Sequence, residues 1–306
     1  MRAYLRLLRP AQWVKNVFVL AGLAFGNKLL DVQGLLWAGV AFAAFCIASS
    51  IVYIINDIAD LESDRQHPSK RMRPLASGEV TVSEALAIAA TLLVGLGLVV
   101  TLGLGHRPVC GVIIGAYLVM NLFYSLALKK VMILDVILIA VGFVLRAYAG
   151  AIAIEVFVSP WLIVCTFTLC LFLGFGKRRC ELAVMGSQGQ AERHRSTLAE
   201  YTPELLNQCL TISAGVAIVT FLLYTLEPAA VLNGAGQPVP PPPFDKQKLM
   251  YTLPLVVYGI FRYVMLIASG RVTGPTDVLI RDRPFLLTVL LWILSVQVII
   301  WVTATQ

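Results

Sequence analysis

Three aspartates near the end of a long apolar run are the residues best suited to chemistry. Asp57, Asp60 and Asp64 are spaced three and four residues apart. If the helix expected in the apolar run continues through them, their carboxylates lie on one face. Carboxylates so close together repel one another strongly in a low-dielectric setting, and Mg2+ with a bridging diphosphate relieves that repulsion. The spacing therefore predicts a Mg2+ site at these aspartates.

Basic and amide side chains flank the same aspartates. Lys70, Arg71 and Arg73 follow within a few residues, and Asn56 directly precedes Asp57. Lysine and arginine can neutralise phosphate oxygens that a metal ion leaves uncovered. The whole stretch is thus suited to a metal-bound diphosphate.

A second charged segment follows the sixth apolar run. Lys177, Arg178 and Arg179 stand beside one carboxylate, Glu181. A basic group with a single acid favours phosphate binding over a second metal site. The alternative is a stop signal for membrane insertion, which also requires clustered positive charge.

Other polar residues occur at the ends of apolar runs or within them. Lys15 and Asn16 stand at a membrane entrance, where a lipid phosphate would lie, although anchoring alone also explains them. Tyr124 and Lys129 place polar groups at the end of the fourth run. Arg146 lies inside the fifth run and must face a neighbouring helix or a cavity.

The composition decides which elements hold these residues. Hydrophobic residues make up 58% of the chain and charged residues 13%, which indicates an all-α, polytopic membrane protein. We expect a single integral membrane domain over residues 1–306, without a removable signal peptide. The apolar runs predict nine spans: Asn16–Leu30, Leu35–Ile55, Val82–Leu104, Val109–Leu126, Ile133–Ile152, Trp161–Phe175, Leu205–Leu226, Leu249–Ile267 and Phe285–Val302.

The distribution of charge predicts orientation and excludes other functions. Most of the 24 basic residues fall in the N-terminal segment and in alternate loops. By the positive-inside rule, the N-terminus and the charged loops are cytoplasmic, in a protein of the cell inner (plasma) membrane. The net charge of +7 is thereby explained without a nucleic acid partner. The six cysteines lack the spacing of a disulfide framework or a zinc site.

The stretch NDIADLESDRQHPSKRMRPLASG resembles the first signature of the UbiA superfamily of membrane transferases. That signature begins with Asn-Asp, continues with spaced aspartates, and closes with Arg-Pro and a glycine. The segments RPAQWVKN, NLFYSLALKK, LDV and FVLRAYAG are also similar to the family. The resemblance implies nine helices around a central cavity whose polar mouth faces the cytoplasm.

Two departures from the family pattern narrow the resemblance. Prenyltransferases of the family carry a second aspartate-rich motif after the sixth helix, where this chain has KRRCEL. They also carry Arg-Thr before the Arg-Pro, where this chain has HPSKRM. Both features resemble the decaprenyl-phosphate phosphoribosyltransferase branch, which serves arabinan (arabinogalactan) synthesis in cell wall biogenesis. That branch transfers 5-phosphoribose from phosphoribosyl diphosphate (PRPP) to a polyprenyl phosphate and releases diphosphate.

The resemblance implies a role for each candidate residue. Asp57, Asp60 and Asp64 would hold Mg2+ beside Asn56, and Lys70 and Arg73 would stabilise the departing diphosphate. The remaining residues would bind substrate: Lys177, Arg178 and Glu181 the ribose 5-phosphate and hydroxyls, with Tyr124, Lys129 and Arg146 completing that pocket, and Lys15 and Asn16 the lipid phosphate.

Two other functions are compatible with parts of the sequence. A prenyltransferase acting on an aromatic acceptor fits the first signature but lacks the second acidic motif. A membrane transporter would explain charges within spans, but the outer loops are poor in ionisable residues. The sequence leaves open the polyprenyl chain length, the number of Mg2+ ions and assembly into a homo-oligomer.

Overall fold

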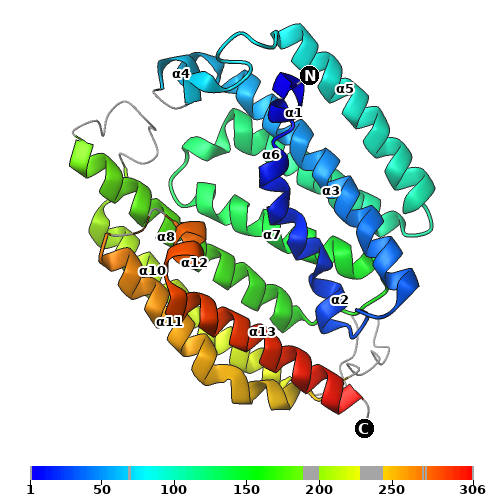
Figure 1. Ribbon diagram of the computed structural model, residues 1–306, viewed down its shortest axis with the longest axis vertical. Coiled ribbons are helices and arrows are strands. Elements are labelled where there is room, and N and C mark those ends of the chain that lie inside the picture. Colours follow the sequence, from blue (N-terminus) through cyan, green and yellow to red (C-terminus); the bar gives the residue numbers. More distant parts are fainter. Residues whose placement is uncertain are drawn as a thin grey trace. The chain divides into compact units, whose positions relative to one another are not determined.

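The computed structural model describes residues 2–67, 70–188, 200–227, 244–270, 272 and 274–304. Within these ranges the regular elements are all helices, which confirms the all-α prediction (Figure 1). Eight helical segments of the described chain are long and apolar enough to cross a membrane, so the protein is a multi-pass membrane protein. They are Val32–Ala59, Val82–Gly103, Pro108–Leu126, Leu134–Ala153, Pro160–Ala183, Pro203–Leu226, Lys246–Ala268 and Arg283–Ala304.

The prediction of nine spans is wrong by one within the described residues, and the difference lies at the first span. Instead of one α-helix over Asn16–Leu30, the chain forms a 3₁₀ helix, η1 (Pro10–Leu20), and a short α-helix, α2 (Ala21–Phe25). Asn27 then has a positive φ of 52°, which ends the helix. An apolar run alone does not distinguish these two helix types, because both form their backbone hydrogen bonds within the segment.

The described chain divides into two compact units. The first contains residues 1–23, 28–138 and 145–156, and the second contains residues 24–27, 139–144 and 157–306. The expectation of a single integral domain remains a prediction. The residues that the sequence assigned to the metal site all belong to the first unit, whereas the segment KRRCEL belongs to the second.

The central element of the first unit is α3 (Val32–Ala59), which packs against η1, α5 (Val82–Leu98) and α6 (Pro108–Leu126). Asp31 caps its N-terminus by accepting a hydrogen bond from the backbone N–H of Gln33. With 28 residues, α3 is about 42 Å long, whereas the apolar core of a bilayer is about 30 Å thick. The helix therefore has enough length for its polar last turns to extend beyond the hydrocarbon.

Small residues bring η1 close to α7 (Leu134–Ala153). A Cβ added at Gly150 would lie 1.8 Å from the carbonyl oxygen of Val19, and one at Gly22 would lie 3.0 Å from the Cα of Ala151. Such close backbone approach is possible only with small side chains at the interface. Because of this contact, the polar residues of η1 have a fixed position relative to α7.

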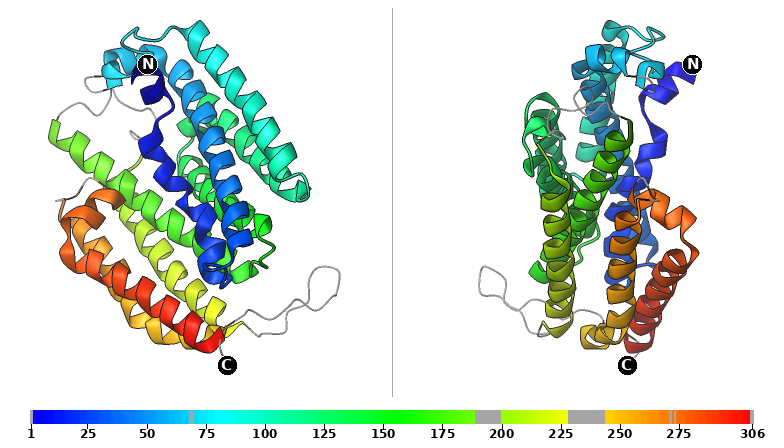
Figure 2. Two further views of the ribbon diagram at one scale, coloured as in Figure 1. Left: turned by 45° about the vertical axis from the view of Figure 1, so that its right-hand side comes forward. Right: turned by 90° about the vertical axis from the view of Figure 1, so that its left-hand side faces the viewer.

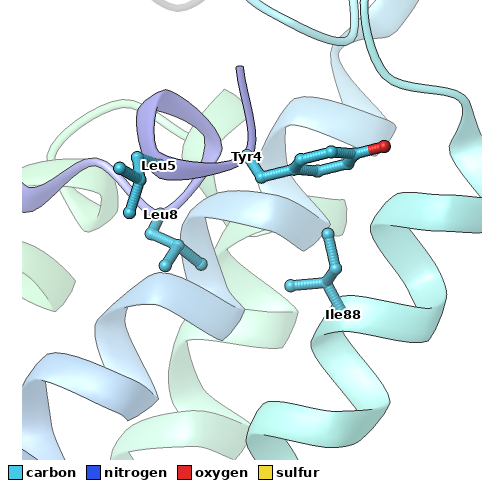
Figure 3. A pocket seen from close by; sticks show the side chains of 4 residues that line it. All are labelled: Tyr4, Leu5, Leu8 and Ile88. Atoms are coloured by element: carbon cyan, nitrogen blue, oxygen red, sulfur yellow. The ribbon is translucent and has the colours of Figure 1, made fainter. Parts of the chain in front are cut away.

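The N-terminal helix α1 (Arg2–Leu7) lies near the beginning of α5. The Tyr4 hydroxyl donates a hydrogen bond to Glu84 Oε1 at 3.0 Å, and Glu84 also forms a capping box with Thr81. A pocket of about 400 Å³ separates the two helices, lined by Tyr4, Leu5, Leu8 and Ile88 (Figure 3).

The first unit also contains several shorter elements. Helix α4 follows α3 after a break at Asp60, and short helical turns connect the longer helices. These elements are α4 (Leu61–Gln66), η2 (Lys70–Met72), the π-helical end of α5, η3 (Val99–Gly103), and η4 (Leu128–Lys130).

In the second unit, α8 packs along α10, and α11 packs along α13 (Figure 2). The sixth predicted span, Trp161–Phe175, lies within α8, which continues as one helix through the charged segment to Gln188. The helices of this unit are α8 (Pro160–Gln188), α10 (Pro203–Leu226), η5 (Lys246–Thr252), α11 (Leu253–Ala268), α12 (Pro275–Arg281) and α13 (Arg283–Ala304).

An ion pair fixes the beginning of α13 in the second unit. Arg262 donates to both carboxylate oxygens of Asp282, at 3.1 and 2.8 Å. Asp282 also accepts a hydrogen bond from the Phe285 N–H at 2.8 Å, as a helix cap does. Hydrogen bonding from Arg262 lowers the pKa of the Asp282 carboxyl. This pair joins α11 to the corner between α12 and α13.

Candidate active site

Asp57 lies in the last turn of α3 and is held by two arginines. Its side chain is only 2% exposed. Asp57 Oδ1 accepts a hydrogen bond from Arg9 Nη2 and another from Arg73 Nη1, the latter at 3.2 Å. A buried carboxylate requires such partners, because desolvation penalises its charged form. Asp57 is thus paired with cations from before and after α3.

Asp64 is buried on α4 and shares one of these cations. Its Oδ2 accepts a hydrogen bond from Arg73 Nη1, the same nitrogen that contacts Asp57. Lys70 Nζ lies 3.8 Å from the other oxygen, Oδ1. The carboxylates of Asp57 and Asp64 therefore converge on one point, which Arg73 occupies.

Asp60 belongs to a separate polar contact. The α-helix ends at this residue, whose φ of −98° and ψ of 6° lie outside helical values. Asp60 Oδ1 pairs with Lys129 Nζ. Asn56 contacts both residues: its Nδ2 donates to Asp60 Oδ2 at 3.2 Å, and its Oδ1 accepts from Lys129 Nζ at 3.3 Å. Since the helix does not continue through Asp60, the three carboxylates do not share one contact point.

The donor set of Asp57 and Asp64 fits Mg2+. Asp64 Oδ1 is buried and accepts no hydrogen bond, and the nearby cation is the Lys70 ammonium at 3.8 Å. Carboxylate oxygens are the ligands that Mg2+ prefers. Among the residues that the structure describes, no three His, Cys, Asp or Glu side chains are gathered closely enough to hold a metal ion. The predicted three-aspartate metal site therefore remains a prediction.

Lys15 and Arg9 form a basic site around Tyr53. Lys15 Nζ lies 3.4 Å from the Tyr53 hydroxyl, and the Arg9 guanidinium carbon lies 5.0 Å from the centre of the tyrosine ring. Burial lowers the pKa of Lys15, and the positive charges of Arg146 and Arg9 lower it further. Cations that destabilise one another in this way favour an anionic ligand.

Asn16 and Arg146 form a buried hydrogen-bond network next to this basic site. Arg146 Nε donates to Asn16 Oδ1 at 2.9 Å, and Arg146 Nη2 donates to the Tyr117 hydroxyl at 2.7 Å. Asn16 is fully buried and donates in turn to Ser49 Oγ at 3.2 Å. Its burial argues against the predicted direct contact with a lipid phosphate. Asn16 is better described as a support for Arg146.

The predicted phosphate segment lies on α8 in the second unit. Glu181 accepts a hydrogen bond from Arg178 Nη1 at 2.5 Å and lies 3.8 Å from Lys177 Nζ. Arg178 is buried, whereas Lys177 is half exposed and could meet a ligand. Tyr124, the last predicted binding residue, is half-buried near the end of α6 in the first unit.

Arg9, Tyr53 and Tyr117 are site residues that the sequence reading missed. Tyr53 had a detectable signal, because it precedes Asp57 by one helical turn on a mostly apolar helix. Arg9 also had one, as the first residue of the similar segment RPAQWVKN. Tyr117 had none, since a tyrosine in an apolar run usually packs in the core.

Comparisons with known proteins identify relatives of this chain. The sequence pattern of the UbiA prenyltransferase family matches residues 16–244. Decaprenyl-phosphate phosphoribosyltransferase of Corynebacterium glutamicum is 30% identical, over 97% of this chain and 86% of that protein. The enzyme of the same name from Mycobacterium tuberculosis is 31% identical, over 95% of this chain and 92% of that protein.

Comparison with solved structures finds a similar fold in the same family. A UbiA homologue from Archaeoglobus fulgidus, bound to DMAPP and Mg2+, superposes with a TM-score of 0.71. The alignment covers 98% of this chain and 99% of that one at 20% sequence identity, which supports the fold alone. With the family pattern matching most of its length, the chain belongs to the UbiA prenyltransferase family.

Proposed function

We propose that the protein transfers 5-phosphoribose from PRPP to a polyprenyl phosphate and releases diphosphate. The observation that carries this proposal is the charge balance of the site. Two converging carboxylates, Asp57 and Asp64, are accompanied by several cations, among them Arg9, Lys15 and Arg73. Two phosphorylated substrates require such an excess of positive charge. The names of the relatives support decaprenyl phosphate as the acceptor.

The diphosphate of PRPP would bind at the converging carboxylates. Mg2+, when bound there by Asp57 and Asp64 with Asp60 nearby, would neutralise the diphosphate and make it a better leaving group. Lys70 and Arg73 already lie beside Asp64 and would turn to the phosphate oxygens as charge develops on them. Lys129 and Asn56 keep Asp60 in place through the contacts described above.

The sugar end of PRPP would be bound by separate residues. We assign the 5-phosphate and the ribose hydroxyls to Lys177, Arg178 and Glu181, with Tyr124 and Arg146 as further binding residues. The half-exposed Lys177 ammonium suits the phosphate, and the Glu181 carboxylate suits hydroxyl donors.

The acceptor phosphate would bind at Lys15, with its polyprenyl chain in the bilayer. An oxygen of this phosphate attacks C1 of the ribose, and the bond between C1 and the diphosphate oxygen breaks with its electron pair leaving on the diphosphate. Because the nucleophile is already an anion, the reaction needs no strong general base. By the positive-inside rule, the basic N-terminal segment supports assigning this chemistry to the cytoplasmic side of the inner membrane.

Labelled substrates test the proposal directly. Membranes containing the protein are incubated with PRPP labelled in the ribose and a polyprenyl phosphate, with and without a chelator of divalent cations. We expect a labelled lipid that depends on the acceptor and disappears with the chelator. Membranes without the protein are the control.

A parallel reaction separates the alternative function. Labelled geranyl diphosphate and a phenolic acceptor replace the two proposed substrates, since the fold resembles that of a homologue bound to DMAPP. Transfer of the prenyl group without any transfer of phosphoribose would overturn the proposal in favour of a prenyltransferase.

A further inference from the structure

Arg9 lies between the two anion-binding parts of the first unit. On one side, its Nη2 contacts the Asp57 carboxylate at the proposed diphosphate site. On the other side, its guanidinium lies over the ring of Tyr53, whose hydroxyl contacts Lys15. Tyr53 and Asp57 are one turn apart on α3, so both contacts of Arg9 are made to the same helix face.

The backbone at Arg9 shows that its position is enforced by the surrounding structure. Its φ of 52° and ψ of 58° are left-handed, which a residue with a side chain adopts only under constraint. The neighbouring contacts supply that constraint. Ser50 Oγ donates to the Leu8 carbonyl at 3.0 Å, and Trp13 Nε1 donates to Ser50 Oγ at 3.1 Å. The turn between α1 and η1 thereby points Arg9 toward α3.

The proposed reaction brings two anions together. The acceptor phosphate must approach a carbon atom that still carries a diphosphate, and like charges repel strongly where water is excluded. A fixed cation between them lowers this repulsion most when the phosphates are closest, in the transition state. Among the described residues, Arg9 is the cation that contacts both the Asp57 carboxylate and the ring of Tyr53, whose hydroxyl contacts Lys15.

We propose that Arg9 bridges the departing diphosphate and the incoming lipid phosphate. In the free protein Arg9 is paired with Asp57. When both substrates are bound, its guanidinium donates to an oxygen of each phosphate while the acceptor oxygen bonds to C1 and the diphosphate leaves. This inference rests on the proposed function and adds Arg9 to the substrate-binding residues.

Two reactions of the same variant test the bridge. We compare Arg9→Gln with wild type for phosphoribosyl transfer to polyprenyl phosphate, and for slow hydrolysis of PRPP without acceptor. Transfer should fall about 100-fold, the usual effect of removing one donor that stabilises developing charge. Hydrolysis should fall much less, because water is a neutral nucleophile and does not need the bridge.

Three further variants separate charge from structure. Arg9→Lys keeps the charge and should recover transfer to within about 10-fold of wild type. Arg9→Gly relaxes the left-handed backbone but removes the charge, so it should fail as Arg9→Gln does. Arg6→Gln is the matched control, since Arg6 makes an exposed pair with Glu79 on the same segment and should leave transfer unchanged.

A binding measurement provides a readout that does not depend on turnover. Stabilisation of the detergent-solubilised protein against heat by a short-chain polyprenyl phosphate is measured for wild type and Arg9→Gln. The bridge predicts weaker stabilisation in the variant, by about 10-fold in the ligand concentration required. Arg6→Gln should match wild type.

Several results would overturn the bridge. One is transfer by Arg9→Gln at a rate within threefold of wild type. Another is an equal loss of transfer and hydrolysis, because Arg9 would then act on the diphosphate alone. If Arg9→Gln does not accumulate in membranes, transfer and hydrolysis are compared in Arg9→Lys instead, and an equal loss of both would again overturn the bridge. A wild-type protein that makes no labelled lipid contradicts the proposed function itself, before any Arg9 variant is considered.

Discussion

The two charged regions of this protein are constructed differently. Around Asp57 and Asp60, the ion pairs join residues far apart in the chain, 48 residues for Arg9 with Asp57 and 69 for Lys129 with Asp60. On α8, Glu181 pairs with residues three and four positions earlier on the same helix. The first arrangement exists only in the folded protein, whereas the second forms with the helix itself.

This difference indicates where geometry matters most. Long-range pairs between buried groups fix side chains to within the tolerance that catalysis requires, and removal of one partner leaves a buried charge uncompensated. Pairs within one helix contribute about 0.3 to 0.5 kcal/mol and hold their groups loosely. We therefore assign bond cleavage to the first region and substrate binding to the second.

The largest effect is expected at Asp57. Replacing Asp57 by Asn keeps the side-chain volume but removes the charge that Arg9 and Arg73 hold and that Mg2+ would require. We expect phosphoribosyl transfer to fall by about 1000-fold or more at saturating Mg2+. The assay is the labelled-lipid reaction, with the amount of folded protein checked by size-exclusion chromatography.

The matched control for this change is Glu62→Gln. Glu62 is an exposed acid on α4 that pairs with Arg65 three residues later, so its loss should leave transfer unchanged. A folded Asp57→Asn protein that retains more than a tenth of wild-type activity would remove Asp57 from the metal site.

Much of the fold could be predicted from the sequence, because long apolar runs have few alternatives in a membrane. The first span could not. Its path depends on the contact of Gly150 with the Val19 backbone, and a contact between distant residues leaves no periodic signal. The end of the helix that contains the sixth span could not be located either, because the apolar run stops at the charges of KRRCEL while α8 continues through them.

The candidate site was predicted in composition more than in geometry. Spacing alone placed three aspartates on one face, but the break at Asp60 turns that residue toward Lys129. The role of Arg9 depends on a left-handed turn before Pro10, which residue types do not reveal at an arginine. The sequence also did not reveal that Asn16 is buried and accepts a hydrogen bond from Arg146.

A smaller effect is expected at Glu181. Replacing Glu181 by Gln removes its pairs with Lys177 and Arg178 within α8. We expect the KM for PRPP to rise by about 10-fold or less, with little change in kcat, as for a residue that binds ground state and transition state equally. Steady-state kinetics with varied PRPP measures this split. A loss comparable to that of Asp57→Asn would contradict the division between the two regions.

The smallest effect is expected at Arg262 and Asp282, which serve as a purely structural reference within the second unit. Because hydrogen bonding from Arg262 holds the folded-state pKa of Asp282 below the unfolded value of about 3.9, the folded protein binds this proton less readily than the unfolded chain does. The pair's contribution to stability is therefore complete above that value and is lost as the pH falls through the folded-state pKa.

We expect Asp282→Asn to lower the thermal midpoint slightly at pH 7. The difference in midpoint between the variant and wild type should narrow as the pH falls below about 4, where wild type also loses the charge. Thermal unfolding of both proteins in detergent between pH 7 and pH 3 measures this, and transfer at pH 7 should be nearly unchanged. A constant gap across that range would contradict a contribution from the Asp282 charge, because Asn can still accept the hydrogen bond from the Phe285 N–H.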